Sequence, residues 1–302
     1  MSNRTTVEQY ATLRRPLRLY QRLRRWMPQR IAQLMGLLGA LVLGALVMLA
    51  FFPATFAPFD PTARVGQPLQ PPDATFKLGT NDIGQDILSE LLWATRISLS
   101  TGLVVGFVSI AIGTVVGLLS GYISDLIDVV LMRVADLTLV LPFLPLVILL
   151  SAYLGPKQRN IILILSLVYW PAPARLIRAR VLTLVQQPYV DAARATGVGP
   201  WRILWAHIWP GVRTIAMTQF VLIASAAILA EASLSFLGLG EPSAKSWGTM
   251  LYFARVSGAF LGRSWAWWVL PTGLMITLTV LSLVLIGYAL ERRFEVALPN
   301  AQ

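Results

Sequence analysis

The chain has 302 residues, of which 56% are hydrophobic and 13% are charged, whereas soluble domains carry about 25% charged residues. This composition places it in the membrane class. Its net charge of +11 comes from arginines beside apolar blocks, which favours an anionic membrane surface over nucleic acid as the partner. Because the chain has no cysteine and a single histidine, a disulfide framework, a thiolate nucleophile, a Cys-ligated metal and a His-rich metal site are excluded.

Residues 1–30 form a basic segment, with eight arginines against one acid, Glu8. The apolar run that follows, residues 31–52, is long enough to cross a bilayer core of about 30 Å as a helix. A cleaved signal peptide is the alternative. However, the basic segment is too long for one, the apolar run exceeds about 15 residues and no A-x-A site follows. We predict an uncleaved first transmembrane helix whose basic end lies in the cytoplasm.

Residues 53–95 are rich in proline and contain more acidic than basic side chains. Proline at this density opposes helix, and the positive-inside rule places a loop of this charge outside the cytoplasm. Within the predicted external loop, Gly79, Asn81, Asp82 and Gly84 have the chemistry of tight turns that precede a capped helix.

Residues 96–290 are predicted to form a transmembrane core of five helices, followed by a cytoplasmic tail at 291–302. The chain is therefore predicted to be an all-α polytopic membrane protein with six spans and both termini inside. The fourth span is interrupted by Pro171 and Pro173, which a span tolerates where neighbouring helices satisfy the freed carbonyls. The apolar blocks of the core lie at about 98–122, 129–154, 160–181, 214–237 and 265–290.

Small residues recur along the second span at steps of four or seven residues. They would form a smooth face on which another helix can approach closely, and we expect ordinary helix packing rather than pore lining. The residues concerned are Gly102, Gly106, Gly113, Gly117 and Gly121.

Two acidic side chains are candidate intramembrane polar contacts: Asp136 in the third span and Glu231 near the outer end of the fifth. A charge inside a span costs a few kcal/mol, so such groups face a bundle interior or water. A structural hydrogen bond or ion pair is favoured over contact with a substrate or a proton. Asp128 and Arg133 are predicted to form a local pair within the third span.

A polar, basic island at residues 188–210 separates the fourth and fifth spans. Counting spans places it on the cytoplasmic side, in agreement with its charge. A short helix is predicted after Pro188, because Gly197 and Pro200 would end it, and a second helix is predicted before Pro210. The island is either a helical hairpin without a partner or a docking surface, where small side chains let another protein approach.

The spacing of Asp191, Ala192, Ala193, Gly197 and Pro210 resembles the EAA loop of ABC importer permeases. That loop has an acidic residue, two alanines, a glycine four positions after the second alanine, and a later proline. In that family it forms short cytoplasmic helices that sit in a groove of an ATPase subunit. The resemblance therefore implies that these five residues couple the chain to an ATPase. Aspartate stands where glutamate is usual, and tryptophan stands where leucine usually precedes the proline; both changes keep the residue class.

Two further segments look like parts of the dipeptide, oligopeptide and nickel permeases. Residues 78–89 are similar to that group's LGTDxxGRDxxSR segment, and residues 231–251 to its region after the fifth span. The resemblance covers about residues 30–290 and is strongest to the second, "C"-type permease of these systems. Gln85 and Glu90 stand where arginine is usual, which weakens the expectation of charge pairing in the external loop.

The resemblance implies a type I ABC importer permease fold in a bacterial or archaeal cytoplasmic membrane. Its implied partners are a homologous second permease, two ATPase subunits and an extracytoplasmic substrate-binding protein, besides the lipid bilayer. The chain has no G-x-x-x-x-G-K-[ST] segment, so ATP and Mg are expected in the ATPase subunits, and no catalytic residue, metal or cofactor is expected here. Peptides are the default cargo, and nickel, a metal chelate and glutathione are the alternatives.

Two other functional classes remain as hypotheses. A secondary transporter could be driven by protons through Asp136 or Glu231, and its transport would survive loss of the ATPase but collapse with the proton gradient. A membrane-embedded enzyme is less favoured, since a chain without cysteine has few catalytic candidates. The single histidine, His207, is interpreted as a structural loop residue rather than a general base.

Overall fold

A computed structural model describes residues 29–123 and 125–295 of the chain. The described part is helical, with two isolated β-bridges and no named strand, which confirms the all-α prediction. Most of the predicted basic segment 1–30 and part of the predicted tail 291–302 lie outside the described residues. The elements in chain order are α2 Gln29–Phe51, α3 Pro53–Phe56, α4 Ile87–Tyr122, α5 Asp125–Val140, α6 Phe143–Leu154, α7 Gln158–Tyr169, α8 Pro171–Val185, α9 Pro188–Ala195, α10 Pro200–Ile203, η1 Leu204–Ile208, α11 Trp209–Phe236, α12 Trp247–Val256, η2 Arg263–Ala266 and α13 Val269–Glu295.

Five helical segments in the described part are long and apolar enough to cross a membrane. The predicted third span over 129–154 is not one straight helix, because α5 and α6 meet there at an angle of 92°. Pro142 lies at this break, and proline lacks the N–H that would continue the helix while its ring clashes with the preceding turn. A sixth span exists only if the bent pair counts as one. The five segments are Arg30–Phe51, Ile87–Tyr122, Gln158–Val185, Pro200–Phe236 and Arg263–Arg292.

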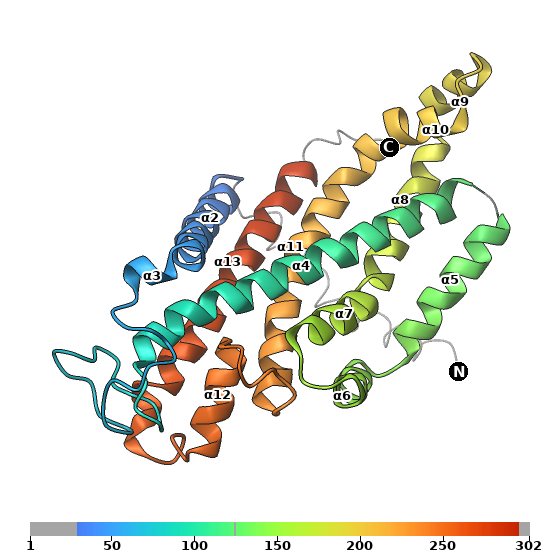
Figure 1. The fold of residues 1–302 in the computed structure, drawn as a ribbon. Helices are drawn as coiled ribbons and strands as arrows, with labels where there is room; N and C mark the ends of the chain where they lie inside the picture. The colour runs from blue at the N-terminus through green and yellow to red at the C-terminus, as the bar shows by residue number, and fades with distance from the viewer. Residues whose placement is uncertain (1–28, 124, 296–302) are drawn as a thin grey trace, which may run out of the picture.

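Helix α4 runs obliquely through the bundle, and α8 and α11 pack against it (Figure 1). Its glycines make both contacts. A Cβ atom added at Gly102 or Gly106 would meet α11, whereas one added at Gly113, Gly117 or Gly121 would meet Trp170 or α8. At Gly117 the added Cβ would lie only 2.7 Å from the carbonyl oxygen of Ala174. The glycine face therefore packs helices together, as predicted.

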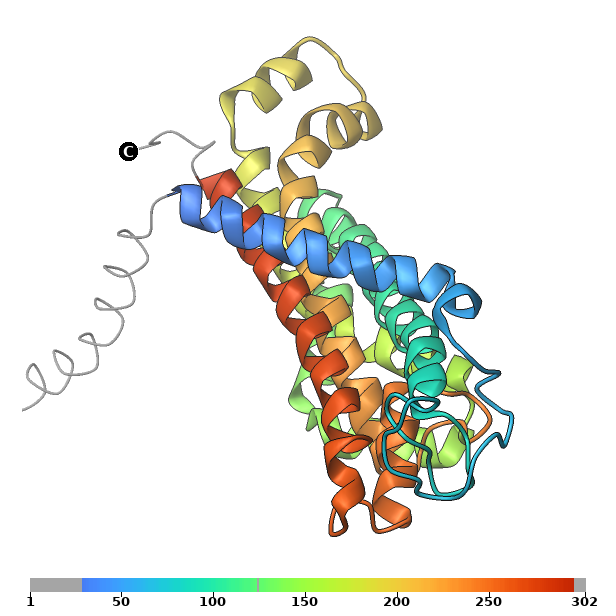
Figure 2. The same cartoon turned by 90° about the vertical axis from the view of Figure 1, so that its left-hand side faces the viewer.

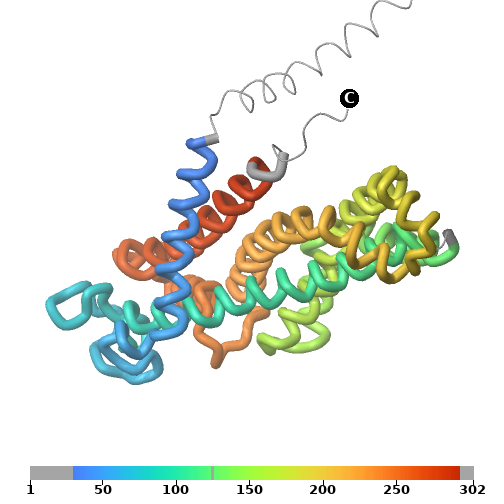
Figure 3. Tube along the Cα trace, turned by 90° about the horizontal axis from the view of Figure 1, so that it is seen from above, coloured from blue at the N-terminus to red at the C-terminus, as the bar shows by residue number. Residues whose placement is uncertain are grey.

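The two ends of the bundle differ. Figure 2 shows α9 and α10 at one end, and the long segment after α3, with α12, at the other. The start of α2 and the end of α13 both lie toward the α9–α10 end. Helix α2 packs against α13, on the side of the bundle away from α5 (Figure 3). The predicted cytoplasmic island and the predicted external loop are thus separated by the length of the bundle.

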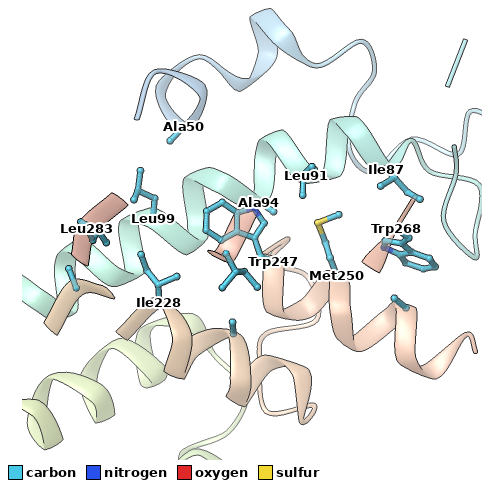
Figure 4. Packing of buried hydrophobic residues seen from close by; sticks show 14 of the residues in the cluster. Ala50, Ile87, Leu91, Ala94, Leu99, Ile228, Trp247, Met250, Trp268 and Leu283 are labelled. Carbon is cyan, nitrogen blue, oxygen red and sulfur yellow. The ribbon is translucent and has the colours of Figure 1, made fainter. Parts of the chain in front are cut away.

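The main apolar core joins α4, α11, α12 and α13 near the end opposite α9 (Figure 4). Trp247 and Trp268 are its largest fully buried side chains. The backbone N–H of Trp247 donates a hydrogen bond to Ser98 Oγ in α4 at 3.0 Å. Helix α12 has only ten residues, or about 15 Å at 1.5 Å per residue, so it is too short to span the membrane. It is fixed within the bundle by this core.

Helix α4 begins at Ile87, inside the segment 53–95, and its start has the predicted turn chemistry. Gly79 and Gly84 have φ angles of +67° and +83°, a region that favours glycine. Asp86 caps the helix, because its carboxylate accepts a hydrogen bond from the backbone N–H of Ser89 at 2.8 Å. This confirms the turns and the capped helix that follows them.

Candidate functional site

Helices α9 and α10 and the turn η1 form a helical hairpin, residues 188–208, outside the main bundle. The first helix begins with Pro188 in its first turn, where proline's missing N–H costs nothing. It ends in a Schellman motif: Val198 N–H donates to the Ala193 carbonyl at 3.1 Å and Gly197 N–H to the Arg194 carbonyl at 3.0 Å. Gly197 has φ +78°, the left-handed conformation that this motif requires.

The hairpin is attached to two spans. Helix α9 follows α8 after two residues, and the backbone is helical without a break from Pro200 to Phe236, so α10 runs into α11. The π-helical turn η1 immediately precedes α11, which has Pro210 in its first turn, and such turns are frequent at functional sites. Movement of the hairpin would therefore be passed directly to α8 and α11.

An apolar core holds the hairpin against the ends of these spans. Val190 and Ala193 from α9 pack with Ile203, Leu204 and Ile208 from α10 and η1, which form the second arm of the hairpin. The same cluster includes α8 and α11 side chains and continues to α4. The hairpin and the ends of the two spans therefore share one apolar core, and such cores are close-packed and resist compression.

The predicted coupling residues divide between the outer face and this core. Asp191, Ala192, Gly197 and Pro210 are exposed, and a Cβ added at Gly197 would meet nothing within 4 Å. Ala193 is buried in the hairpin core instead, so only its neighbours offer a surface to another protein. The Asp191 carboxylate lies 3.5 Å from the Arg194 guanidinium.

Aromatic side chains cover more of the hairpin surface. Trp201 and Trp205 are 61% and 58% exposed, and Trp205 packs edge-on against Trp209. Tryptophan is enriched at the centres of protein interfaces, and its exposed position was not recognised from the sequence. His207 stacks on Tyr189 with ring centroids 6.3 Å apart, which fits a structural role. Among the residues the structure describes, no group of three metal-binding side chains occurs.

Both intramembrane acids have a neighbour. The Asp136 carboxylate lies 3.6 Å from the Arg175 guanidinium of α8, and the two side chains are 46% and 57% exposed. Glu231 is fully buried, and its Oε1 accepts a hydrogen bond from Ser235 Oγ at 2.8 Å. This placement fits the structural interpretation of Glu231 better than contact with a substrate.

The predicted pair of Asp128 with Arg133 is wrong. Asp128 binds Arg178 of α8 through both carboxylate oxygens and also accepts a hydrogen bond from Ser120. The Arg178 guanidinium presents two parallel N–H donors to the two carboxylate oxygens of Asp128. This bidentate geometry makes a strong charge-assisted contact between α5 and α8.

A buried polar cluster at the opposite end was missed. Lys245 Nζ, in the segment between α11 and α12, forms an ion pair with Glu90 and donates a hydrogen bond to Gln85 Oε1 at 2.7 Å. Asn81 Nδ2 donates to the other Glu90 oxygen at 3.0 Å. Burial raises the pKa of the nearby Asp82 carboxyl, although Lys245 favours its charged form. Charge pairing is thus present here, contrary to the expectation from Gln85 and Glu90.

Comparison with known proteins gives consistent matches along the chain. The family model described as "Binding-protein-dependent transport system inner membrane component" matches residues 113–296. The Di/tripeptide transport system permease protein DppC of Pseudomonas aeruginosa (strain UCBPP-PA14) is 36% identical over 282 residues, 90% of this chain and 92% of that protein. The Dipeptide transport system permease protein DppC of Escherichia coli (strain K12) is 40% identical over 265 residues, 85% and 87% of the two chains. The Glutathione transport system permease protein GsiD of Pectobacterium atrosepticum is 35% identical over 271 residues, 89% and 87%.

Proposed function

The chain belongs to the family of binding-protein-dependent transport system inner membrane components, as a multi-pass permease subunit of an ABC importer, and on this premise we propose that it carries short peptides inward. The observation that carries the choice of cargo is the identity of 36% and 40%, over at least 85% of this chain, to permeases named for di- and tripeptide transport. The permease named for glutathione is a comparable relative. Glutathione is itself a small peptide, so it is the second candidate cargo.

We propose that the exposed face of the 188–208 hairpin docks on an ATPase subunit, with Asp191, Ala192 and Gly197 in the contact. The partners are a homologous permease, two ATPase subunits that hold ATP and Mg, and an extracytoplasmic binding protein. Closure of the ATPases would push the hairpin, and its two arms would tilt α8 and α11. The permease alternates between an inward-open and an outward-open state. Transport requires that ATP bind one of these states more tightly than the other, and that the cargo also bind the two states with different affinities.

The proposed orientation follows from the two ends of the bundle. The hairpin end carries the basic loop and, in this orientation, faces the cytoplasm together with both ends of the described chain. The acidic segment 53–86 and α12 then face outward, where the binding protein docks. This supports both termini lying in the cytoplasm, in agreement with the charge distribution.

Uptake by the purified assembly in lipid vesicles tests the proposed function. With binding protein outside and ATP inside, we expect labelled di- and tripeptides to accumulate, and glutathione to be carried less well. Uptake should stop when the ATPase subunits carry an inactivated P-loop and persist when an uncoupler abolishes the proton gradient. Uptake that needs the proton gradient but not the ATPases would identify a secondary transporter, and accumulation of nickel or a chelate instead of peptide would contradict the cargo.

A further inference from the structure

A charged cleft lies between α5 and α8, and none of its lining residues belongs to the 188–208 hairpin. It has a volume of 460 Å³, within the range of about 300–1,000 Å³ typical of small-molecule sites. Asp128, Arg133 and Asp136 line it from α5, and Arg175 and Arg178 line it from α8. Two acids thus face three arginines between α8, which belongs to a candidate membrane span, and α5, which is apolar enough to span only together with α6.

The position of these charges requires water or protein rather than lipid beside the cleft. A charged side chain facing the hydrocarbon core is energetically costly, so such groups face cavities or partner helices. Helix α5 lies at the edge of the bundle (Figure 1), and the Asp136 and Arg175 side chains are about half exposed, so the cleft has an open side at the surface of this chain. In an assembly of two permeases that side can face a shared aqueous path.

The charged groups are engaged to different degrees. Both carboxylate oxygens of Asp128 are engaged, by Arg178 and Ser120. The Asp136–Arg175 pair is looser, with 3.6 Å between the charged atoms and both side chains about half exposed. Arg133 is exposed, and no ion pair joins it to any residue that the structure describes. The cleft therefore offers one acid and two arginines that a solute can reach.

We propose that this cleft binds the charged termini of the peptide during its passage through the membrane, an inference that rests on the proposed function. The peptide's carboxylate binds Arg133 and Arg175, and its ammonium group binds Asp136. Positions 133 and 136 are three residues apart on α5 and so share one face of the helix. The loose ion pair opens to admit a zwitterion without leaving either charge unpaired, which limits the energetic penalty of burying both charges. Asp128 and Arg178 hold the two helices together beside it.

Replacement of Asp136 by asparagine tests the proposal in the complete reconstituted transporter, with Arg180→Gln as the control. Arg180 lies on α8 but does not line the cleft. We expect Asp136→Asn and Arg133→Gln each to lower the number of peptides moved per ATP by about tenfold or more, because each removes a charge-assisted hydrogen bond to the peptide. ATP hydrolysis and the KM set by the binding protein should change little, and Arg180→Gln should behave as wild type.

A charge swap separates substrate contact from a purely structural clasp. Asp136→Arg combined with Arg175→Asp keeps the ion pair between the helices but places two arginines together on α5. We expect wild-type thermal stability with transport still low. Full recovery of transport in the swapped variant, or unchanged transport in Asp136→Asn, would overturn the cleft proposal. The proposed function would still stand in that case, provided that the wild-type complex takes up peptide. A wild-type complex that imports no peptide overturns the proposed function and the cleft proposal with it.

Discussion

Replacing Gly197 by glutamate is expected to abolish the stimulation of ATP hydrolysis by substrate, while the subunit still inserts into the membrane and assembles with its partner permease. The position is exposed, with open space around it, so the new side chain meets no neighbouring atom, and its cost within the chain is the backbone strain of a left-handed φ of +78°. It would project a charge into the proposed ATPase contact, where disruption of a central position costs about 2 kcal/mol or more. The readouts are ATPase activity with and without loaded binding protein, and the amount of ATPase subunit that co-purifies.

Gly258→Glu is the matched control for this experiment. Gly258 ends α12 in the same Schellman motif, with φ +77° and the same open surroundings. The same substitution therefore introduces the same charge and the same left-handed strain of about 1–2 kcal/mol, at the opposite end of the bundle. ATPase subunits should be retained in this variant. If both variants lose the ATPases equally, backbone strain explains the effect and the hairpin is not the docking surface.

Replacement of Lys245 by methionine is expected to destabilise the protein by about 3–5 kcal/mol, because it leaves a buried carboxylate without its cation. Glu90 is only 3% exposed, and the ion pair joins the start of α4 to the segment before α12. We expect a large fall in the thermal unfolding temperature in detergent and poor recovery of monodisperse protein.

Two further variants establish the cause. Lys245→Met combined with Glu90→Met should recover most of the lost stability, since apolar side chains of similar size often replace a buried pair without loss. Arg194→Met removes one partner of the exposed Asp191–Arg194 pair and should change stability by less than about 1 kcal/mol. If Lys245→Met unfolds at the wild-type temperature, the cluster is not a structural link between the two segments.

Local signals explain what could be predicted from the sequence. The hairpin is set by prolines and glycines within about 20 residues, and Gly197 stands where its left-handed φ is required. The glycine face of α4 follows from spacing along one helix, although the sequence does not say that it meets α11 at one end and α8 at the other. Such patterns depend on neighbouring residues, so they can be recognised in one chain.

What was missed depends on tertiary structure or on a break within an apolar run. Glu90 and Lys245 are 155 positions apart, and Asp128 and Arg178 are 50 positions apart, so their pairing depends on how the spans pack. The bend between α5 and α6 was missed because hydrophobicity continues across Pro142, although the proline itself was a usable signal. The burial of Ala193 is also tertiary, because it depends on the second arm of the hairpin.

Crosslinking from the hairpin tests the coupling role most directly. The chain contains no cysteine, so Ala192→Cys on the hairpin and Ala74→Cys in the segment after α3 each introduce a unique, exposed thiol. In the assembled transporter, a short thiol crosslinker should join position 192 to an ATPase subunit, with a yield that changes when ATP binds, and should leave position 74 unlinked to the ATPases. Crosslinks to the ATPases from position 74, with none from position 192, would contradict both the docking surface and the proposed orientation of the chain.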